Sequence, residues 1–302
     1  MKLEECYEFC RTVQRAHSRT YYFSTRLFPP DVRRHVHALY AFTRHADEIV
    51  DDLKAGTDVE ARLEALEAFE AETMAALAGE EVEDPILRAF TNTARERGIG
   101  RAHVEPFLRS MKMDTCVSRY PTYEDLEEYM YGSAAVVGLM MCRIIGVEAE
   151  EALPHAGALG EAMQLSNFLR DIREDWERGR IYLPLEDLKR FGYSEEDLAR
   201  GLVNEEFVEL MRFEIGRARM LYLVADGGMG YIPRGRRYPV LVARQLYAAI
   251  LEQIEGQGYE VFSGRAGTTF AEKLRVAAAC AVREPGGDPT PHNEPENVDR
   301  VR

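Results

Sequence analysis

The sequence predicts an all-α protein, because its apolar residues recur at helical spacing and strand signals are missing. Apolar positions repeat three and four residues apart in most segments, and no convincing run alternates polar with apolar residues. Prolines punctuate these segments at Pro29, Pro30, Pro85, Pro121, Pro184 and Pro233. No internal repeat or Pro/Ser-rich linker divides the chain. We therefore expect one all-α domain over residues 1–282 and a disordered tail over residues 283–302, which is rich in Pro, Gly and polar residues.

The composition is that of a globular and strongly acidic protein. Of the 302 residues, 46% are hydrophobic and 30% are charged, and the formal net charge is −14. A chain with this charge is not expected to bind nucleic acid over a broad surface. An anionic ligand would need metal ions or local arginines to overcome the protein's own field.

The cysteines and the apolar runs indicate a cytoplasmic protein. None of the five cysteines forms the Cys-x-x-Cys pair of a zinc site, and an odd count without a pattern is typical of reduced thiols. The N-terminal segment MKLEECYEFC lacks the apolar core of a signal peptide. The longest apolar run, AAVVGLMMCRIIGV, contains Arg143 and is too short to span a bilayer, so we expect a buried helix there.

The segment RRHVHALYAFTRHADEIVDD, which starts at Arg33, places acids among apolar residues. One face of a helix here carries Asp47 at its centre and Asp51 at its edge, among Val36, Leu39, Tyr40, Thr43 and Val50. A carboxylate buried without a partner costs several kcal/mol or shifts its pKa. The segment has no lysine, and Arg44 alone cannot balance several carboxylates. Asp47 therefore needs another cation.

The middle of the sequence contains two predicted helix starts and one stretch of small residues. Thr122 with an acid three residues on predicts a helix start, and the same logic predicts a helix from Ser194 that stops at Gly201. Small residues then permit close helix packing or leave space for a ligand, and the sequence leaves both readings open. These residues are Gly132, Ser133, Ala134, Ala135 and Gly138.

The segment QLSNFLRDIREDWERGRIYLP, which starts at Gln164, predicts a helix with three distinct faces at about 100° per residue. The apolar face carries Ala162, Leu165, Phe168, Leu169, Ile172 and Trp176. A mixed-charge face carries Arg170, Arg173, Glu174 and Glu177. The third face carries only oxygen-bearing ligand types, namely Gln164, Asn167, Asp171 and Asp175.

Taken alone, this third face has two interpretations, a solvated acidic surface or a metal site. The inward acid Asp47 on a second helix favours the metal site, because two helices then direct carboxylates to one place. A ligand set made of oxygen is typical of Mg²⁺ or Mn²⁺. Mg²⁺ commonly binds through carboxylates, waters and a phosphate, so acidic helices with nearby arginines are suited to hold a diphosphate and assist its departure.

Five motifs in order resemble the squalene/phytoene synthase family, from about His17 to Arg265. DEIVDD and NFLRDIRED are similar to its two aspartate-rich motifs, and HSRTYYFSTRLFPP is similar to its N-terminal signature. YGSAAVVG and GRIYLP complete the series, and VHALYAFTRHADEIVDD is most similar to bacterial phytoene synthases. Glu48 departs from the pattern, since Asp is also common there. It lies off the apolar stripe, so we expect little consequence.

The resemblance implies the isoprenoid synthase helical bundle, with the two aspartate-rich helices facing each other across a central cavity. The implied reaction is a head-to-head condensation of two prenyl diphosphates through a cyclopropylcarbinyl diphosphate, giving phytoene from geranylgeranyl diphosphate without a nicotinamide cofactor. The implied metal is Mg²⁺, with Mn²⁺ as the other candidate. Its implied ligands are Asp47, Asp51, Asn167, Asp171 and Asp175.

The resemblance also implies the substrate contacts. His17, Ser18 and Arg19 hold a diphosphate, Arg44 and Arg170 add positive charge, and Gln164 and Arg265 are further substrate-binding residues, while Tyr129 and Tyr247 face the reacting carbons. Each has an ordinary structural alternative. His17 fits a helix cap, the two tyrosines fit core positions with bonded hydroxyls, and Arg44 and Arg170 fit ion pairs with adjacent acids.

The chain length and the class of protein have competing readings. By resemblance Thr25 and His37 lie toward the prenyl tails, and neither is a large aromatic residue, which favours twenty-carbon tails. The alternatives are a squalene or dehydrosqualene synthase acting on farnesyl diphosphate, and a non-catalytic isoprenoid-binding relative. The intact acidic motifs disfavour the latter. Head-to-tail elongation and terpene cyclisation are disfavoured by HSRTYY. The greasy product predicts a peripheral contact with a membrane.

Overall fold

The all-α prediction is confirmed. A computed structural model describes residues 1–51, 59–264 and 267–283. These residues form helices, turns and loops, and the only extended pairing among them is a single bridge between Arg119 and Ile181. None of the helices in these ranges is both long and apolar enough to cross a membrane. Residues 284–302 of the expected tail lie outside the described residues.

Fourteen α-helices and three short turns of other helical types make up the described fold. The first half contains α1 (Leu3–His17), α2 (Arg19–Thr25), α3 (Pro30–Val50), α4 (Val59–Ala78), α5 (Pro85–Arg97), α6 (Arg101–Cys116) and α7 (Tyr123–Met130). A π-helical turn, η2 (Tyr131–Ala135), leads into α8 (Val136–Ile145). The second half contains η3 (Glu150–Ala152), α9 (Leu153–Glu177), α10 (Leu185–Arg190), α11 (Glu195–Ala199), α12 (Glu205–Asp226), η4 (Met229–Tyr231), α13 (Arg237–Gly256) and α14 (Phe270–Arg283).

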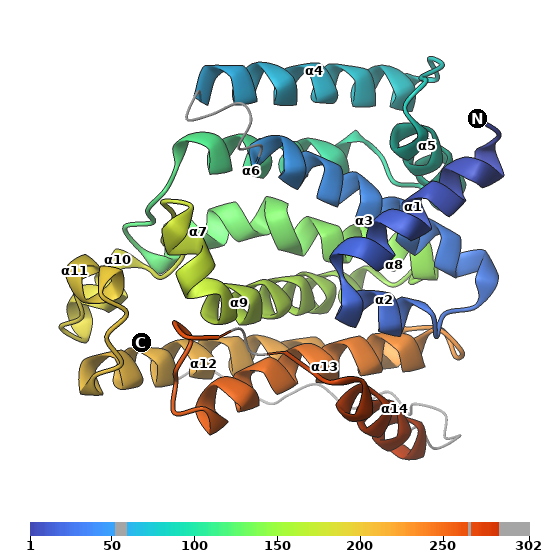
Figure 1. Ribbon diagram of the computed structural model, residues 1–302. Coiled ribbons are helices and arrows are strands. Elements are labelled where there is room, and N and C mark those ends of the chain that lie inside the picture. Colours follow the sequence, from blue (N-terminus) through green and yellow to red (C-terminus); the bar gives the residue numbers. More distant parts are fainter. Residues whose placement is uncertain (52–58, 265–266, 284–302) are drawn as a thin grey trace.

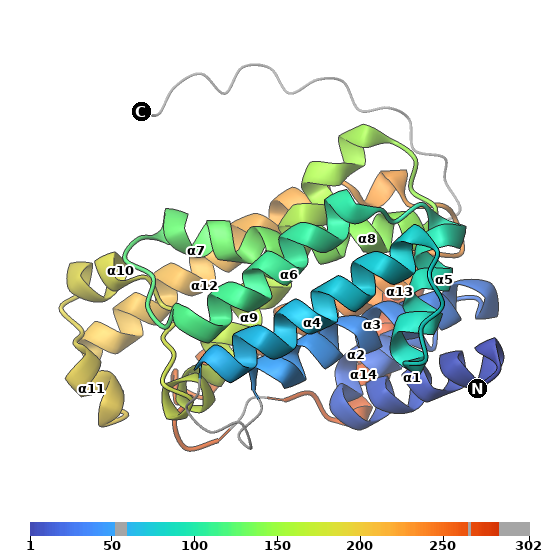
Figure 2. The same cartoon turned by 90° about the horizontal axis from the view of Figure 1, so that it is seen from above.

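The long helices stack in layers (Figures 1 and 2). In the view of Figure 1, α4 covers one side, and α12, α13 and α14 cover the opposite side. The helices α3, α6, α8 and α9 lie between these layers, and the short α10 and α11 gather at one end of the stack. Helix α9 packs along α12, α13 and α8. Both aspartate-bearing helices, α3 and α9, therefore belong to the interior of the molecule.

Two apolar clusters hold these layers together. The first joins α1, α3, α5, α6 and α8 around Phe42, whose ring stacks on Phe90 with a centroid distance of 3.8 Å. The second joins α7, α9, α12 and α13, and it contains the predicted apolar face of α9, including Leu165 and Phe168. Helix α9 packs on α8 of the first cluster and on α12 and α13 of the second. The single domain over residues 1–282 stays a prediction, which this packing supports.

The predicted helix boundaries are confirmed at three places. Thr122 caps α7, because its hydroxyl accepts from the N–H of Asp125 while its own N–H donates to the Asp125 carboxylate. Ser194 caps α11 in the same way. Gly201 follows that helix with φ of +62°, a left-handed conformation that favours glycine. The apolar run forms α8, where Ile144 and Ile145 are buried and Arg143 is exposed.

Small residues bring η2 and α8 into close contact with α9. A Cβ atom at Gly138 would lie 2.3 Å from the carbonyl oxygen of Ala156, and one at Gly160 would lie 2.3 Å from that of Ala134. Ser133, Ala134 and Gly138 also line a central cavity. Both readings of the small-residue stretch are therefore correct, for different parts of it.

The close contact at Gly160 can be tested by adding one carbon atom. We expect Gly160→Ala to lower the free energy of unfolding by about 2 kcal/mol, because the new Cβ forces α9 away from a backbone carbonyl. The control is Gly216→Ala on the exposed side of α12, where a Cβ meets nothing within 4 Å. That change is expected to stabilise by about 0.5–1 kcal/mol through helix propensity. Denaturant unfolding of both variants measures the difference, and equal effects would contradict the packing argument.

Candidate active site

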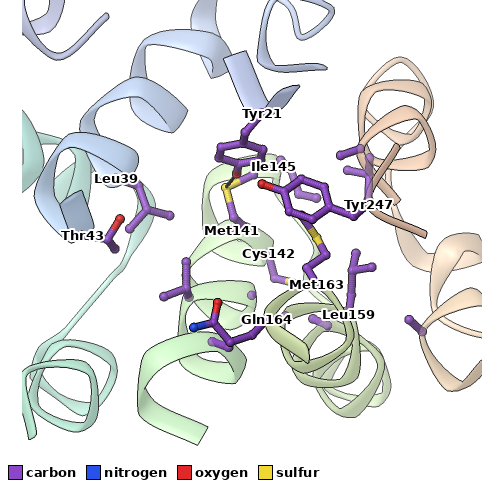
Figure 3. A pocket seen from close by; sticks show the side chains of 18 of the residues that line it. Tyr21, Leu39, Thr43, Met141, Cys142, Ile145, Leu159, Met163, Gln164 and Tyr247 are labelled. Atoms are coloured by element: carbon purple, nitrogen blue, oxygen red, sulfur yellow. Dashed lines mark hydrogen bonds between the residues drawn. The ribbon is translucent and has the colours of Figure 1, made fainter. Parts of the chain in front are cut away.

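A cavity of about 300 Å³ lies between the aspartate-bearing helices, with a polar end and an apolar end. Asp47 of α3 and Asn167 and Gln164 of α9 line the polar end. Figure 3 shows Thr43 and Gln164 inside this space, and Tyr21 and Tyr247 pointing toward each other from two sides of it. The structure thus brings the predicted faces of α3 and α9 to one cavity.

The apolar part of the cavity extends away from these groups along three helices. On α3 the lining residues run from Asp47 back to Leu39, and on α9 they run from Asn167 back to His155. At 1.5 Å per residue, the α9 wall alone is about 18 Å long. On α8, which runs the other way, Val137, Met141 and Ile145 continue the same wall. Such a cavity fits a ligand with a polar head and a long apolar tail.

Two carboxylates of the aspartate-bearing helices have pKa values well above the usual range, and one of them, Asp47, lines the cavity. Burial raises the pKa of Asp47 to about 7, with Arg44 opposing the shift and Asp114 and Asp51 adding to it. Burial, together with the charge of Asp171, raises the pKa of Asp175 to about 8. No ion pair to Asp47 or Asp175 occurs within the described part of the chain. Neither carboxylate therefore has a cation beside it among the described residues, and for Asp47 this is the need that the sequence predicted.

Asp114 of α6 belongs to this group of acids, and the sequence reasoning missed it. The hydroxyls of Tyr129 and Tyr182 donate to its two carboxylate oxygens at 2.9 and 2.8 Å. Burial raises its pKa, and its charge acts on both Asp47 and Asp175. The signal was present, because Asp114 continues the apolar stripe of Phe107 and Met111 at helical spacing, just as Asp47 lies within its own stripe.

The arginines that neutralise Asp51 were also missed. Arg180 of the GRIYLP segment approaches Asp51 at 2.9 Å, and Arg178 approaches it at 3.4 Å. Arg180 also donates to the backbone oxygen of Asp114 at 3.3 Å. The loop after α9 thus returns positive charge to the acids of α3 and α6. The periodicity of one segment cannot predict contacts of this kind with distant segments.

In this structure Arg44 and Arg170 form ion pairs with adjacent acids, which is the structural alternative to the predicted diphosphate contacts. Arg170 forms a bidentate pair with its neighbour Asp171, at 2.7 and 2.5 Å. Arg44 donates to Glu48 at 3.0 Å, and His17 lies 3.6 Å from the same carboxylate. Glu48, which was expected to have little consequence, thus lies between Arg44 of its own helix and His17 of α1, and that expectation stays a prediction.

A preformed metal cluster is not found. No three Asp, Glu, His or Cys side chains are close enough to hold one metal ion in the ranges that the structure describes. The physical reason is that Asp171 and Asp51 are occupied by arginines, while Asp47, Asp114 and Asp175 repel one another. The donor set is nevertheless all oxygen and short of positive charge, so these residues fit a hard divalent cation once the arginines move.

The remaining predicted residues divide by position. Tyr129 and Tyr247 both line the cavity, and Ser18 forms a hydrogen bond with Tyr40, another lining residue. Arg19 begins α2 and is exposed, and Arg265 lies outside the described residues.

The expectation that Thr25 and His37 lie toward the tails is wrong. Both are buried, yet neither lines the cavity. Gln14 instead joins them in a polar network, donating to the Thr25 hydroxyl at 2.9 Å and lying 2.5 Å from the His37 ring.

Comparisons with known proteins agree with this geometry. The family described as squalene/phytoene synthase matches residues 14–272. A 15-cis-phytoene synthase of a Synechocystis strain is 39% identical over 288 residues, which cover 90% of this chain and 83% of the relative. A phytoene synthase of Arthrospira platensis is 38% identical, covering 92% of this chain and 93% of the relative.

Solved structures resemble the fold throughout. A dehydrosqualene synthase in complex with a ligand superposes with a TM-score of 0.87 at 26% identity, covering 93% of this chain and 97% of the other. A squalene synthase of Alicyclobacillus acidocaldarius superposes with a TM-score of 0.78 at 29% identity, covering 86% and 96%.

The raised pKa of Asp175 predicts a pH dependence of stability without metal. The folded protein holds this proton to about pH 8, whereas the unfolded chain releases it near pH 4, so folding loses stability as pH rises between these values. The loss is at most about 1.4 kcal/mol per pH unit for this group. We expect Asp175→Asn to be increasingly more stable than the wild type from pH 5 to pH 8.5, in chelator, by denaturant unfolding.

The matched control is Glu177→Gln, an exposed change on the same helix. Its stability difference from the wild type should not vary with pH in this range. An Asp175→Asn difference that is equally flat would show that the Asp175 carboxylate is already compensated in the metal-free protein.

Proposed function

The chain belongs to the squalene/phytoene synthase family, and we propose that it condenses two geranylgeranyl diphosphate molecules head to head to give phytoene. It is a prenyltransferase of this family. One observation carries the proposal: Asp47 and Asn167 line the polar end of a cavity whose walls are otherwise largely apolar for about 18 Å, and the charges of Asp51 and Asp114 act on Asp47. A prenyl diphosphate has this same division between head and tail.

The polar end supports binding of the two diphosphates with divalent cations. The family depends on divalent metals in general, and we propose Mg²⁺, held by Asp47, Asp51, Asn167, Asp171 and Asp175. When bound, the metal neutralises the acids and makes diphosphate a better leaving group. Arg170 lies beside Asp171, and Arg44 and His17 lie beside Glu48, so these side chains are placed to turn from acids to diphosphate oxygens.

The cavity walls would serve the carbon chemistry. Tyr129 stays fixed, because its hydroxyl donates to Asp114 and its ring packs on Tyr182 at 5.6 Å. Aromatic faces of this kind stabilise cationic carbon centres. Tyr247 and Tyr21 border the same space from α13 and α2. The apolar walls exclude water from a carbocation that water would otherwise capture.

The length of the cavity supports a twenty-carbon substrate. An extended twenty-carbon prenyl chain measures roughly 18 Å and a fifteen-carbon chain roughly 13 Å, at about 1.2 Å per main-chain bond. The α9 wall reaches about 18 Å at His155, and lining continues past it to Ala152 and Val147. The relatives named phytoene synthase point the same way. The second candidate, a synthase acting on farnesyl diphosphate, is favoured by the likeness to dehydrosqualene synthase.

Purified protein with Mg²⁺ and geranylgeranyl diphosphate should yield a forty-carbon hydrocarbon, with or without NADPH. Asp171→Asn should lower the rate about 100-fold or more, because the site loses a metal ligand worth about 2.7 kcal/mol or more in the transition state. Extracted products are identified by chromatography and mass. Glu177→Gln, on the outward face of the same helix, should keep the wild-type rate.

A thirty-carbon product from farnesyl diphosphate alone would move the assignment to squalene or dehydrosqualene synthesis, which NADPH dependence separates. Full activity of a folded Asp171→Asn variant would contradict the metal assignment. Turnover of neither substrate would leave an isoprenoid-binding protein.

We also propose a cytoplasmic location with peripheral membrane contact for release of the product. Apolar side chains stand exposed on one face of α12, namely Met220, Leu223 and Val224, with Tyr231 of η4 beside them. The same segment turns Ala225 and Met229 inward to line the apolar part of the cavity. The exposed arginine Arg234 follows, as suits a membrane surface. The five cysteines form no disulfide, which fits a reducing compartment.

Replacing the exposed apolar residues should weaken vesicle binding and leave the fold intact. We expect Met220→Gln/Leu223→Gln to reduce co-sedimentation with anionic phospholipid vesicles about tenfold, since both side chains leave water on binding. The control is Val282→Gln on α14, which is 84% exposed and apart from the cavity. Equal binding by wild type and double variant would reject this surface.

A further inference from the structure

A second cavity, of about 390 Å³, lies where α1, α2 and α3 meet. It shares no lining residue with the candidate active site. Its lining residues come in three pairs spaced four apart, and such residues lie on one helix face. They are Arg11 and Arg15 from α1, Tyr22 from α2 with Arg26 directly after that helix, and Arg33 and His37 from α3. We call this cavity the arginine pocket.

The arginine pocket concentrates positive charge in a protein whose formal net charge is −14. Arg11 is neutralised by Glu8 and also donates to the Tyr22 hydroxyl at 3.0 Å. Arg15, Arg26 and Arg33 form no ion pair with any residue that the structure describes, and Arg33 donates only to the backbone oxygen of Phe28, at 3.3 Å. Three like charges that converge on one cavity repel each other, and an anion between them would relieve that repulsion.

His37 adds an independent sign of a ligand. Its side chain is only 3% exposed, and its Nε2 atom has no hydrogen-bond partner among the described residues. The Gln14 amide donates its N–H to Thr25, so its oxygen accepts from His37 Nδ1. Burial and the charges of Arg11 and Arg33 lower the pKa of His37 to about 4, so the ring is neutral. Its Nε2 is then a buried acceptor that lacks a donor.

The arginine side chains favour an anionic ligand, and the Nε2 atom of His37 favours a ligand that can donate a proton. Arginine side chains match the oxygens of phosphate and sulfate alike. Inorganic phosphate keeps an O–H throughout the neutral range, whereas a phosphate monoester keeps its O–H in the monoanionic form, which dominates below its second pKa of about 6. That O–H can donate to His37 Nε2, whereas sulfate and phosphate diesters offer this nitrogen only further lone pairs.

We propose that the arginine pocket binds a phosphate group bearing an O–H, either as free phosphate or as a monoester headgroup such as that of phosphatidic acid. The phosphate oxygens would accept from Arg15, Arg26 and Arg33, and the O–H would donate to His37. Bound there, the anion joins α1, α2 and α3. It also holds α2 between two cavities, because Tyr22 faces the pocket and Tyr21 faces the candidate active site.

The first experiment compares phosphate with sulfate at equal ionic strength, without divalent metal. Millimolar phosphate should raise the thermal midpoint of the wild type, and sulfate should do so much less. In Arg26→Gln/Arg33→Gln, phosphate should bind at least about tenfold more weakly, because two charge-assisted contacts are lost. The control is Arg95→Gln/Arg109→Gln, which removes the same charge from exposed positions outside the pocket.

A second readout keeps the test independent of folding defects. Long-range ¹H–¹⁵N spectra of the wild-type histidines should show the His37 Nε2 resonance moving with phosphate and staying in place with sulfate. Without phosphate, the pocket variant should melt no lower than the wild type, since it loses repelling charges.

Vesicles distinguish the two sources of the phosphate group. If the source is a lipid, vesicles with phosphatidic acid should bind the wild type more tightly than vesicles with phosphatidylglycerol, a diester without the O–H, and the pocket variant should lose that preference. If the source is free phosphate, only the soluble arm responds. The proposal is overturned if neither arm responds, if sulfate equals phosphate, or if the pocket variant binds as the wild type does.

Discussion

The rest of the structure depends on holding several carboxylates beside apolar surface. Asp47, Asp114 and Asp175 come from three helices, and each has a pKa raised by burial. Burial is the main cost of charging these groups, and repulsion from neighbouring acids adds to it. Two tyrosine hydroxyls donate to Asp114, and Arg180 contacts both Asp51 and the backbone oxygen of Asp114. These contacts lower that cost without removing it, and the divalent cation proposed for this site would lower it further.

Close helix packing makes that arrangement possible. Gly138 and Gly160 let α8 and α9 approach until a single Cβ would collide with a backbone carbonyl. The walls on either side then diverge enough to leave a cavity of about 300 Å³. The carboxylates occupy the end where α3 and α9 finish, and the apolar side chains occupy the rest. A diphosphate head and a hydrocarbon tail are thereby sorted by the same pair of helices, without any separate domain for either part.

The spacing of residues in a single helix predicts which of them share a face. It does not predict contacts that depend on a second helix. The apolar face of α9 and the inward position of Asp47 follow from spacing, and both are confirmed by burial. Asp114 carried the same signal and was overlooked. The pairing of Arg180 with Asp51 joins positions 129 residues apart, and no local pattern predicts it. The prediction for Thr25 and His37 was wrong for a related reason. A residue close in sequence to residues that line a cavity can still lie on another face of its helix.

Helix α2 connects the two charged regions of this molecule. Its Tyr21 borders the cavity that has Asp47 at its polar end, and its Tyr22 borders the arginine pocket. Arg15, Arg26 and Arg33 have no acidic partner among the described residues, and an anion bound between them would lower their mutual repulsion. The Nε2 atom of His37, which has no hydrogen-bond partner among those residues, favours an anion that can also donate a proton. The seven residues of α2 thus lie between a proposed cation site and a proposed anion site. An ion bound at either site would restrict the position of α2 at the other.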